Sequence, residues 1–132
     1  MKIIETFLKG CFIIEPTFFK DNRGCFLLEY NKKEFQEKIG FEGDFVLGNQ
    51  STSQYGVVRG LHLQRGDFEQ AKLVRVVKGK ILDVAVDARK DSKTFGKVFT
   101  IELSAENNKQ LFVPRGFLHG FSVLENDTIV SY

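Results

Sequence analysis

The sequence predicts an all-β fold: a double-sheet jelly roll with one short helix. Short apolar segments follow one another at intervals of about ten residues, separated by turn residues, as in sandwiches and barrels. Only residues 31–39 have a helical pattern. The chain has 132 residues, of which 42% are hydrophobic. This size suits one core, so we expect a single domain over residues 1–132.

The expected strands follow from these apolar segments. In chain order they are residues 11–14, 25–30, 45–49, 57–63, 72–77, 80–87, 97–103, 110–113, 120–124 and 128–132. Gly79 lies between two of them and can adopt the positive φ of a tight turn. We therefore expect a hairpin at residues 77–80.

Alternation along a strand places side chains on two faces. In residues 80–87 it puts Asp83, Ala85 and Asp87 on one face, opposite three apolar side chains. In residues 59–64 it puts His62 with Gln64, on the face opposite Arg59. A small barrel with polar side chains on an inner face usually holds a ligand.

The predicted helix has signals at both ends. Asn31 can cap the first turn, with Glu34 at the capping-box position. Phe35 and Ile39 share one face, and Gly40 follows. We expect a short amphipathic helix over residues 31–39.

Composition excludes several classes of protein. The net charge of +2 gives no general attraction to nucleic acid or membrane surfaces. The cysteines Cys11 and Cys25 fit no disulfide framework or zinc spacing, so we expect two buried free thiols. We find no signal-peptide pattern and no apolar run of membrane-spanning length, and we expect a cytoplasmic protein.

The only two histidines lie in two similar stretches, residues 57–64 and 114–121. Histidine titrates near neutral pH, so the pair suggests either proton transfer or a metal site. Both stretches resemble the two sequence motifs of the cupin superfamily. Gly56 and His62 have the spacing of the first motif, with Glu69 at its acid position, and residues 114–119 fit the second motif.

The way this chain differs from the cupin motifs argues against a bound metal. The cupin motif has a second histidine where this chain has Gln64, and an amide is a poor ligand for transition metals. Two histidines and one distant glutamate leave a tight site short of ligands. We expect a cupin cavity that has kept the histidines without a metal.

Six linked motifs sharpen the resemblance. They are residues 59–64, 70–75, 83–89, 92–96, 103–107 and 114–121, and together they resemble the dTDP-4-dehydrorhamnose 3,5-epimerase family. The resemblance implies an enzyme without metal or cofactor. It implies inversion at C3 and C5 of a nucleotide-linked 4-keto-6-deoxy sugar, in deoxysugar and polysaccharide biosynthesis, by a homodimer.

The same resemblance assigns roles to residues. His62 becomes the base, Lys72 the cation beside the developing enolate, and Tyr132 the acid that reprotonates the opposite face. The expected substrate-binding residues are Arg23 and Arg59 at the diphosphate, Phe19, Phe26 and Asn49 near the nucleotide, and His119, Asp83 and Gln64 in the pocket. From the strand pattern alone, without these motifs, we would expect Asp83 and Asp87 to be solvated residues.

The chain also departs from the family pattern. Leu28 stands where the family has a glutamate, and Leu47-Gly48 replaces a Gln-Asp pair. The chain ends at Tyr132, where the family continues, so we expect it to lack a C-terminal segment and to hold Tyr132 loosely. Two alternatives stay open: a nucleotide-sugar ketoisomerase, and a sugar-binding cupin that has lost activity.

Overall fold

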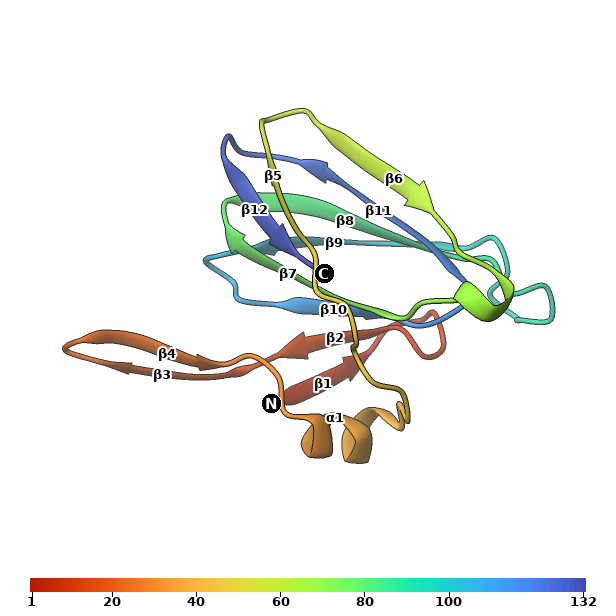
Figure 1. The fold of residues 1–132 in the computed structure, drawn as a ribbon, viewed down its shortest axis with the longest axis horizontal. Coiled ribbons are helices and arrows are strands. Elements are labelled where there is room, and N and C mark those ends of the chain that lie inside the picture. The colour runs from red at the N-terminus through yellow and green to blue at the C-terminus, as the bar shows by residue number, and fades with distance from the viewer.

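The computed structural model describes residues 1–132. The strands are β1 (Lys2–Glu5), β2 (Phe12–Glu15), β3 (Thr17–Asp21), β4 (Gly24–Leu28), β5 (Gln50–Ser53), β6 (Val58–His62), β7 (Lys72–Lys78), β8 (Lys80–Asp87), β9 (Val98–Ser104), β10 (Gln110–Val113), β11 (Phe117–Val123) and β12 (Thr128–Ser131) (Figure 1). One α-helix, α1 (Lys32–Ile39), and one 3-10 turn, η1 (Gly66–Phe68), complete the chain. No helix is both long enough and apolar enough to cross a membrane.

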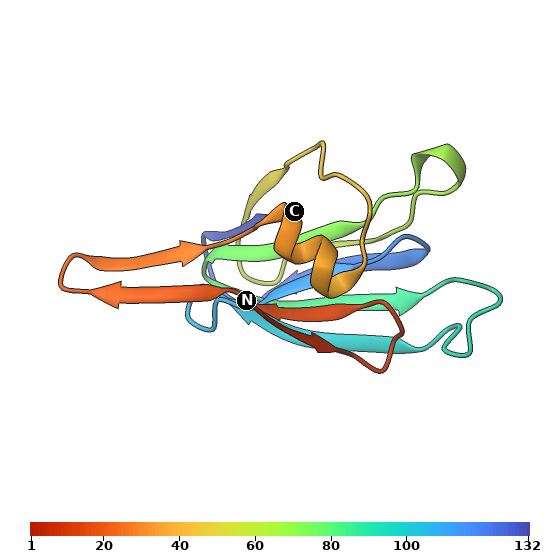
Figure 2. The ribbon, with the colours of Figure 1, turned by 90° about the horizontal axis from the view of Figure 1, so that it is seen from below.

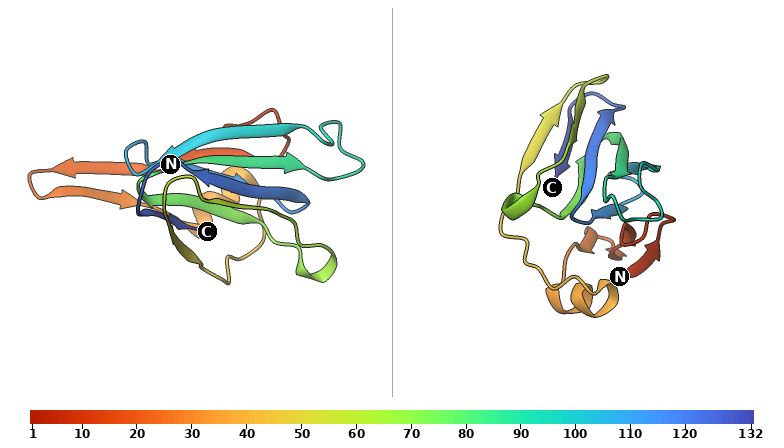
Figure 3. Two further views of the ribbon diagram at one scale, coloured as in Figure 1. Left: turned by 90° about the horizontal axis from the view of Figure 1, so that it is seen from above. Right: turned by 90° about the vertical axis from the view of Figure 1, so that its right-hand side faces the viewer.

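Two antiparallel sheets face each other and form the body of the molecule. Six strands form one sheet in the order β1-β2-β10-β7-β12-β5, and four form the other in the order β6-β11-β8-β9. Figure 3 shows these layers from above and from one end. The predicted all-β, double-sheet fold with one short helix is confirmed.

The main core lies between the two sheets. Val74 and Val76 on β7 share one buried cluster with Ile81 and Ala85 on β8. Alternate residues of a strand share a face, so Lys72 points into the same space as Val74 and Val76. The alternation of side chains along β7 therefore places the Lys72 ammonium at the edge of an otherwise apolar interior.

A second, aromatic core lies on the outer face of the six-stranded sheet. Helix α1 places the fully buried Phe35 against Ile14 of β2 and Phe112 of β10. Its ends are as predicted: the Asn31 side chain accepts a hydrogen bond from the Glu34 backbone N–H, and Gly40 ends the helix in the left-handed conformation. The expected turn at Gly79, with φ +78°, is also confirmed.

Strands β3 and β4 form a separate two-stranded hairpin. Figure 2 shows it extending alone from one end of the body, away from both main sheets. Phe18, Phe19 and Phe26 are exposed on it. Because an isolated hairpin is marginally stable in water, an apolar, unsupported arm is typical of a segment that contacts another surface.

Some predicted elements differ from the structure. Residues 45–49 form no strand, because the Phe45 ring packs into the aromatic cluster while Val46 and Leu47 are both exposed, which breaks strand alternation. Strand β5 follows directly instead. Strands β1 and β3 were not predicted. Of the two thiols expected to be buried, Cys11 is buried but Cys25 is exposed on the hairpin.

Candidate functional site

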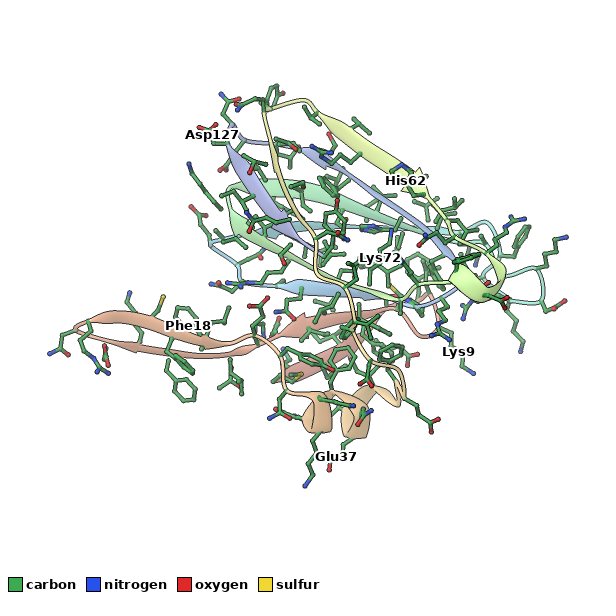
Figure 4. All side chains as sticks on the ribbon, viewed as in Figure 1. Lys9, Phe18, Glu37, His62, Lys72 and Asp127 are labelled. Atoms are coloured by element: carbon green, nitrogen blue, oxygen red, sulfur yellow. The ribbon has the colours of Figure 1, made fainter.

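A cavity of about 860 Å³ opens between the two sheets. Its walls come from the loop between α1 and β5, the end of β6, the beginning of β7 and the end of the chain. All three predicted catalytic residues, His62, Lys72 and Tyr132, line it, as do Asn49 and Gln64. Figure 4 shows Lys72 in the middle of the molecule and His62 on the strand above it.

A bulge in β6 directs His62 into this cavity. His62 pairs with His119 on β11, whereas Arg59 pairs with Phe121, so three residue steps on β6 match two on β11. The extra residue puts Arg59 and His62 on the same, inward face. The prediction from simple alternation, which separated them, is therefore wrong.

Two glycines permit the bulge. Gly60 has φ +109°, and a Cβ built on it lies 2.7 Å from the Gly120 Cα and from the His119 carbonyl oxygen. A Cβ on Gly120 lies 2.5 Å from the Arg59 carbonyl oxygen. The two backbones therefore approach too closely for any side chain at either position.

Arg59 points across the space between the sheets. Its Nε donates a 3.0 Å hydrogen bond to Ser53 Oγ on β5, a strand of the opposite sheet. Arg59 is not among the residues that line the cavity wall. The bond leaves the two terminal nitrogens of the guanidinium available for an anion.

Lys72 is half-buried and forms neither an ion pair nor a side-chain hydrogen bond. Burial lowers the pKa of Lys72, and the negative charge of Asp83 opposes part of this shift. The ammonium therefore lies in a poorly solvated place without its own counterion, where an anionic ligand gains most from it.

Behind the cavity wall, His119 and Asp83 form a buried pair. His119 Nε2 lies 2.8 Å from Asp83 Oδ1, with side-chain exposures of 4% and 0%. The other oxygen, Asp83 Oδ2, is buried and has no hydrogen-bond partner. The pattern-based interpretation of Asp83 and Asp87 as solvated residues is wrong, because both are fully buried.

Tyr132 is held at both of its backbone groups. Its N–H donates to the Asn49 carbonyl oxygen at 3.0 Å, and its carbonyl oxygen accepts from the Asn49 N–H at 2.8 Å. Its ring packs edge-on against Phe121, with centroids 6.3 Å apart. The expectation that Tyr132 is held loosely is therefore wrong for its backbone, which is paired with Asn49.

The family model for dTDP-4-dehydrorhamnose 3,5-epimerase matches residues 5–132. The chain belongs to the dTDP-4-dehydrorhamnose 3,5-epimerase family. The enzyme of that name from Shigella flexneri is 48% identical over 132 residues, which are 100% of this chain and 73% of that protein. The Salmonella typhimurium enzyme is 49% identical over 124 residues, covering 94% and 68%. Members of this family are isomerases.

Solved structures of family members agree with the fold. The Elizabethkingia anophelis epimerase superposes with a TM-score of 0.95 at 56% identity, covering 99% of this chain and 72% of that one. The Legionella pneumophila epimerase, in complex with dTDP-4-keto-L-rhamnose, gives 0.94 at 42% identity, covering 98% and 69%. The predicted cupin fold is confirmed by these neighbours.

Three predicted substrate-binding residues lie elsewhere. Phe19, Arg23 and Phe26 surround a shallow depression on the β3–β4 hairpin, and Arg23 pairs with Asp21 at 2.6 Å. Figure 4 labels Phe18 on this hairpin, well away from His62 and Lys72. A single copy of the chain does not bring these residues to the cavity lined by His62 and Lys72.

Sequence reasoning missed other parts of the cavity wall. Tyr30, Phe41 and Phe45 form its aromatic side, and Arg115 lies at its exposed rim. The excess of phenylalanine, 14 in 132 residues, was the available signal for the aromatic side. No three His, Cys, Asp or Glu side chains are placed to hold a metal ion; the expectation of a site without metal or cofactor stays a prediction.

Proposed function

We propose that this chain inverts C3 and C5 of a nucleotide-linked 4-keto-6-deoxy sugar of the dTDP-4-dehydro-6-deoxyglucose type. The observation that carries the proposal is the meeting of His62, Lys72 and Tyr132 in one cavity. Inversion of a carbon beside a ketone through an enolate needs a base, a group that stabilises the enolate oxygen, and an acid, and these three side chains can supply them.

In the proposed reaction, each of the two sugar carbons loses one proton and gains another on its opposite face. His62 takes the proton from the carbon next to the ketone, and the electron pair moves to the carbonyl oxygen. The Lys72 ammonium stabilises the resulting enolate oxygen through its charge. Tyr132 then donates its phenolic proton to the opposite face of the carbon, which inverts the centre. Solvent takes the proton from His62 and restores the phenol, so both residues can act at the second centre.

The remaining predicted residues serve recognition in this proposal. Arg59 binds the diphosphate through its free guanidinium nitrogens, as Arg suits phosphate oxygens. Asn49 and Gln64 contact the ligand from the cavity wall. His119 contributes from the buried pair, with its ring orientation fixed by Asp83.

The proposal extends to a homodimer in which the hairpin of one copy completes the site of the other. Phe19, Arg23 and Phe26 contact a nucleotide only if the hairpin enters another copy's cavity, because they lie away from their own. The Phe19 and Phe26 rings lie 6.2 Å apart, tilted by 38° to one another, and are 58% and 64% exposed. Such a pair offers a surface for a base.

Incubation with dTDP-4-keto-6-deoxyglucose in deuterium oxide tests the reaction. Deuterium is expected at sugar C3 and C5, with both centres inverted in the product. The variant His62→Ala is expected to lose this exchange while dTDP binding stays near wild type, because the base acts on the rate rather than on affinity.

The product also tests the alternatives. A 3'-monoepimerase from Streptomyces bikiniensis is 31% identical, with a TM-score of 0.86. A product inverted at C3 alone therefore indicates a monoepimerase with the same fold. A carbonyl moved from C4 to C3 indicates a ketoisomerase. Ligand binding without any exchange indicates the inactive sugar-binding protein and overturns the proposal.

A further inference from the structure

Lys72 differs from the other lysines in its surroundings. It is the single lysine among the residues that line the cavity. At the surface, Lys32 forms an ion pair with Asp44 and Lys80 with Glu102. Lys72 is half-buried in the cavity wall without an ion pair, and the carboxylate whose charge acts on it, Asp83, is bound to His119.

This difference changes the chemistry of the amine. Burial lowers the pKa of Lys72, whereas hydrogen bonds from their ammonium groups to carboxylates raise the pKa of Lys32 and of Lys80. At a pH below both values, each unit of pKa difference changes the neutral fraction about tenfold. Lys72 therefore has a larger share of nucleophilic, neutral amine at mildly basic pH than Lys32 or Lys80.

An unpaired cation lies on the rim of the same cavity. Arg115 is exposed, lines the cavity, and forms neither an ion pair nor a hydrogen bond with another side chain. A guanidinium binds phosphate oxygens in pairs. A ligand with both a phosphate and a carbonyl group therefore meets a complementary group at each end.

We propose that the cavity is a site of reversible covalent modification, at which an aldehyde bearing a phosphate group forms an imine with Lys72 while Arg115 binds its phosphate. This inference rests on the amine and the rim arginine, and it does not depend on the proposed epimerase reaction. It assigns a ligand class that differs from nucleotide sugars.

The modification step is a condensation. The lone pair of the neutral Lys72 amine attacks the aldehyde carbon, and the carbonyl electrons move to oxygen, which takes up the proton lost by nitrogen. The carbinolamine then loses its hydroxyl and the remaining N–H proton as water, leaving a carbon–nitrogen double bond. Water reverses the step, so the modification is lost on dilution.

Pyridoxal 5′-phosphate followed by borohydride tests the position of the imine. Borohydride delivers hydride to the imine carbon, water protonates the nitrogen, and the amine becomes permanent and visible by peptide mass spectrometry. With limiting reagent at mildly basic pH, most label is expected on Lys72. Label spread evenly over the surface lysines of the wild-type protein overturns the proposal.

Matched variants test the same point. Lys72→Arg keeps the charge and is expected to remove the main labelled peptide, whereas Lys80→Arg, an ion-paired surface lysine, is expected to leave it. Circular dichroism checks that both variants fold. Unchanged total labelling in folded Lys72→Arg contradicts the proposal.

The role of the phosphate needs a separate comparison. 5-Deoxypyridoxal has the same free aldehyde without the phosphate and is expected to label Lys72 about tenfold more slowly, the scale of one charge-assisted hydrogen bond. Arg115→Ala is expected to bring the labelling rate of pyridoxal 5′-phosphate down toward that of 5-deoxypyridoxal. Equal labelling by the two aldehydes in the wild type contradicts the phosphate contact.

Discussion

At the scale of single residues, the contact between Tyr132 and Phe121 governs the proposed acid step. A phenol protonates carbon only when its ring is held on the correct side of the sugar. Backbone bonds to Asn49 fix the strand, but only ring packing fixes the ring. The orientation of Tyr132 therefore depends on Phe121.

Phe121→Leu is expected to lower net inversion about tenfold while deuterium exchange by His62 remains, because the smaller side chain frees the Tyr132 ring. The ratio of product formed to deuterium incorporated measures this. Phe117→Leu is the matched control: Phe117 is equally buried in the same core but packs under Arg89. Equal losses in both variants indicate a general packing defect and contradict the positioning role.

Lys72 gives a prediction for the pH profile. The proposed role needs the ammonium, so activity is lost as pH rises through the pKa of Lys72, which burial lowers from its ordinary value. The alkaline limb of kcat/KM is therefore expected below the usual lysine range. Asp83→Asn removes a charge that raises this pKa, so the limb moves to still lower pH.

The exposed carboxylate of Asp67 on η1 provides the control. Asp67→Asn is expected to leave the alkaline limb in place, since burial and the charge of Asp83 set the direction of the Lys72 pKa and Asp67 is a solvent-exposed charge. Thermal unfolding of both variants separates a titration effect from a loss of folded protein. If the alkaline limb of the Asp83→Asn variant stays at the wild-type pH, the expected effect of the Asp83 charge on the pKa of Lys72 is contradicted.

At the scale of elements, the end of β8 is fixed by one buried carboxylate. Asp87 accepts hydrogen bonds from the Arg89 backbone N–H and guanidinium and from the hydroxyls of Ser92 and Thr94. Arg89 continues to the Lys9 carbonyl oxygen and lies over the Phe117 ring. The network joins the β8–β9 loop to the beginning of β11, the strand that carries His119.

Burial by itself raises the pKa of Asp87, but the hydrogen bonds from Arg89, Ser92 and Thr94 outweigh it and hold this pKa far below its usual range. A depressed folded-state pKa stabilises the fold above the unfolded-state pKa of about 3.9, and this stability is lost as pH falls below that value. Asp87→Asn is expected to destabilise by about 3–5 kcal/mol at neutral pH, since it leaves Arg89 unpaired.

Urea unfolding across pH measures this effect. The difference between wild type and Asp87→Asn is expected to shrink as pH falls through the acid range. Asp91→Asn, an exposed carboxylate in the same loop, is expected to change stability little. A difference that is constant down to strongly acidic pH contradicts the electrostatic origin.

The secondary-structure elements also show which parts of the fold could be predicted from the sequence. The strands of the core, the capped helix and the Gly79 turn were predictable because local periodicity and backbone preference decide them. The bulge at Gly60 was not, because it follows from the close approach of Gly120 on another strand. Residues 45–49 had strand-like composition, but tertiary packing of Phe45 decided their conformation.

At the scale of the whole molecule, the site residues divide into two groups. The motif residues His62, Lys72 and Tyr132 converge because strand pairing joins their segments, and the sequence resemblance was sufficient to select them. Phe19 and Arg23 were selected by the same resemblance, yet a single copy holds them apart from the cavity. Sequence patterns do not record which copy of a chain supplies a residue.

Mixing two inactive variants tests the proposed exchange of hairpins. His62→Ala removes the base from the cavity, and Arg23→Ala removes the cation from the hairpin. In a mixed dimer, one site combines the intact cavity of the Arg23→Ala chain with the intact hairpin of the His62→Ala chain. Random pairing makes half of all dimers mixed, so the mixture is expected to regain about a quarter of wild-type activity.

The matched control is a mixture of His62→Ala with Lys72→Ala, whose defects both lie in the cavity. Each site in that mixed dimer contains one defective cavity, so no recovery is expected. Differently tagged chains, co-purified through both tags, confirm that mixed dimers form. Mixed dimers of His62→Ala and Arg23→Ala without recovered activity contradict hairpin exchange, and they return Arg23 to its ion pair with Asp21 on an arm that takes no part in catalysis.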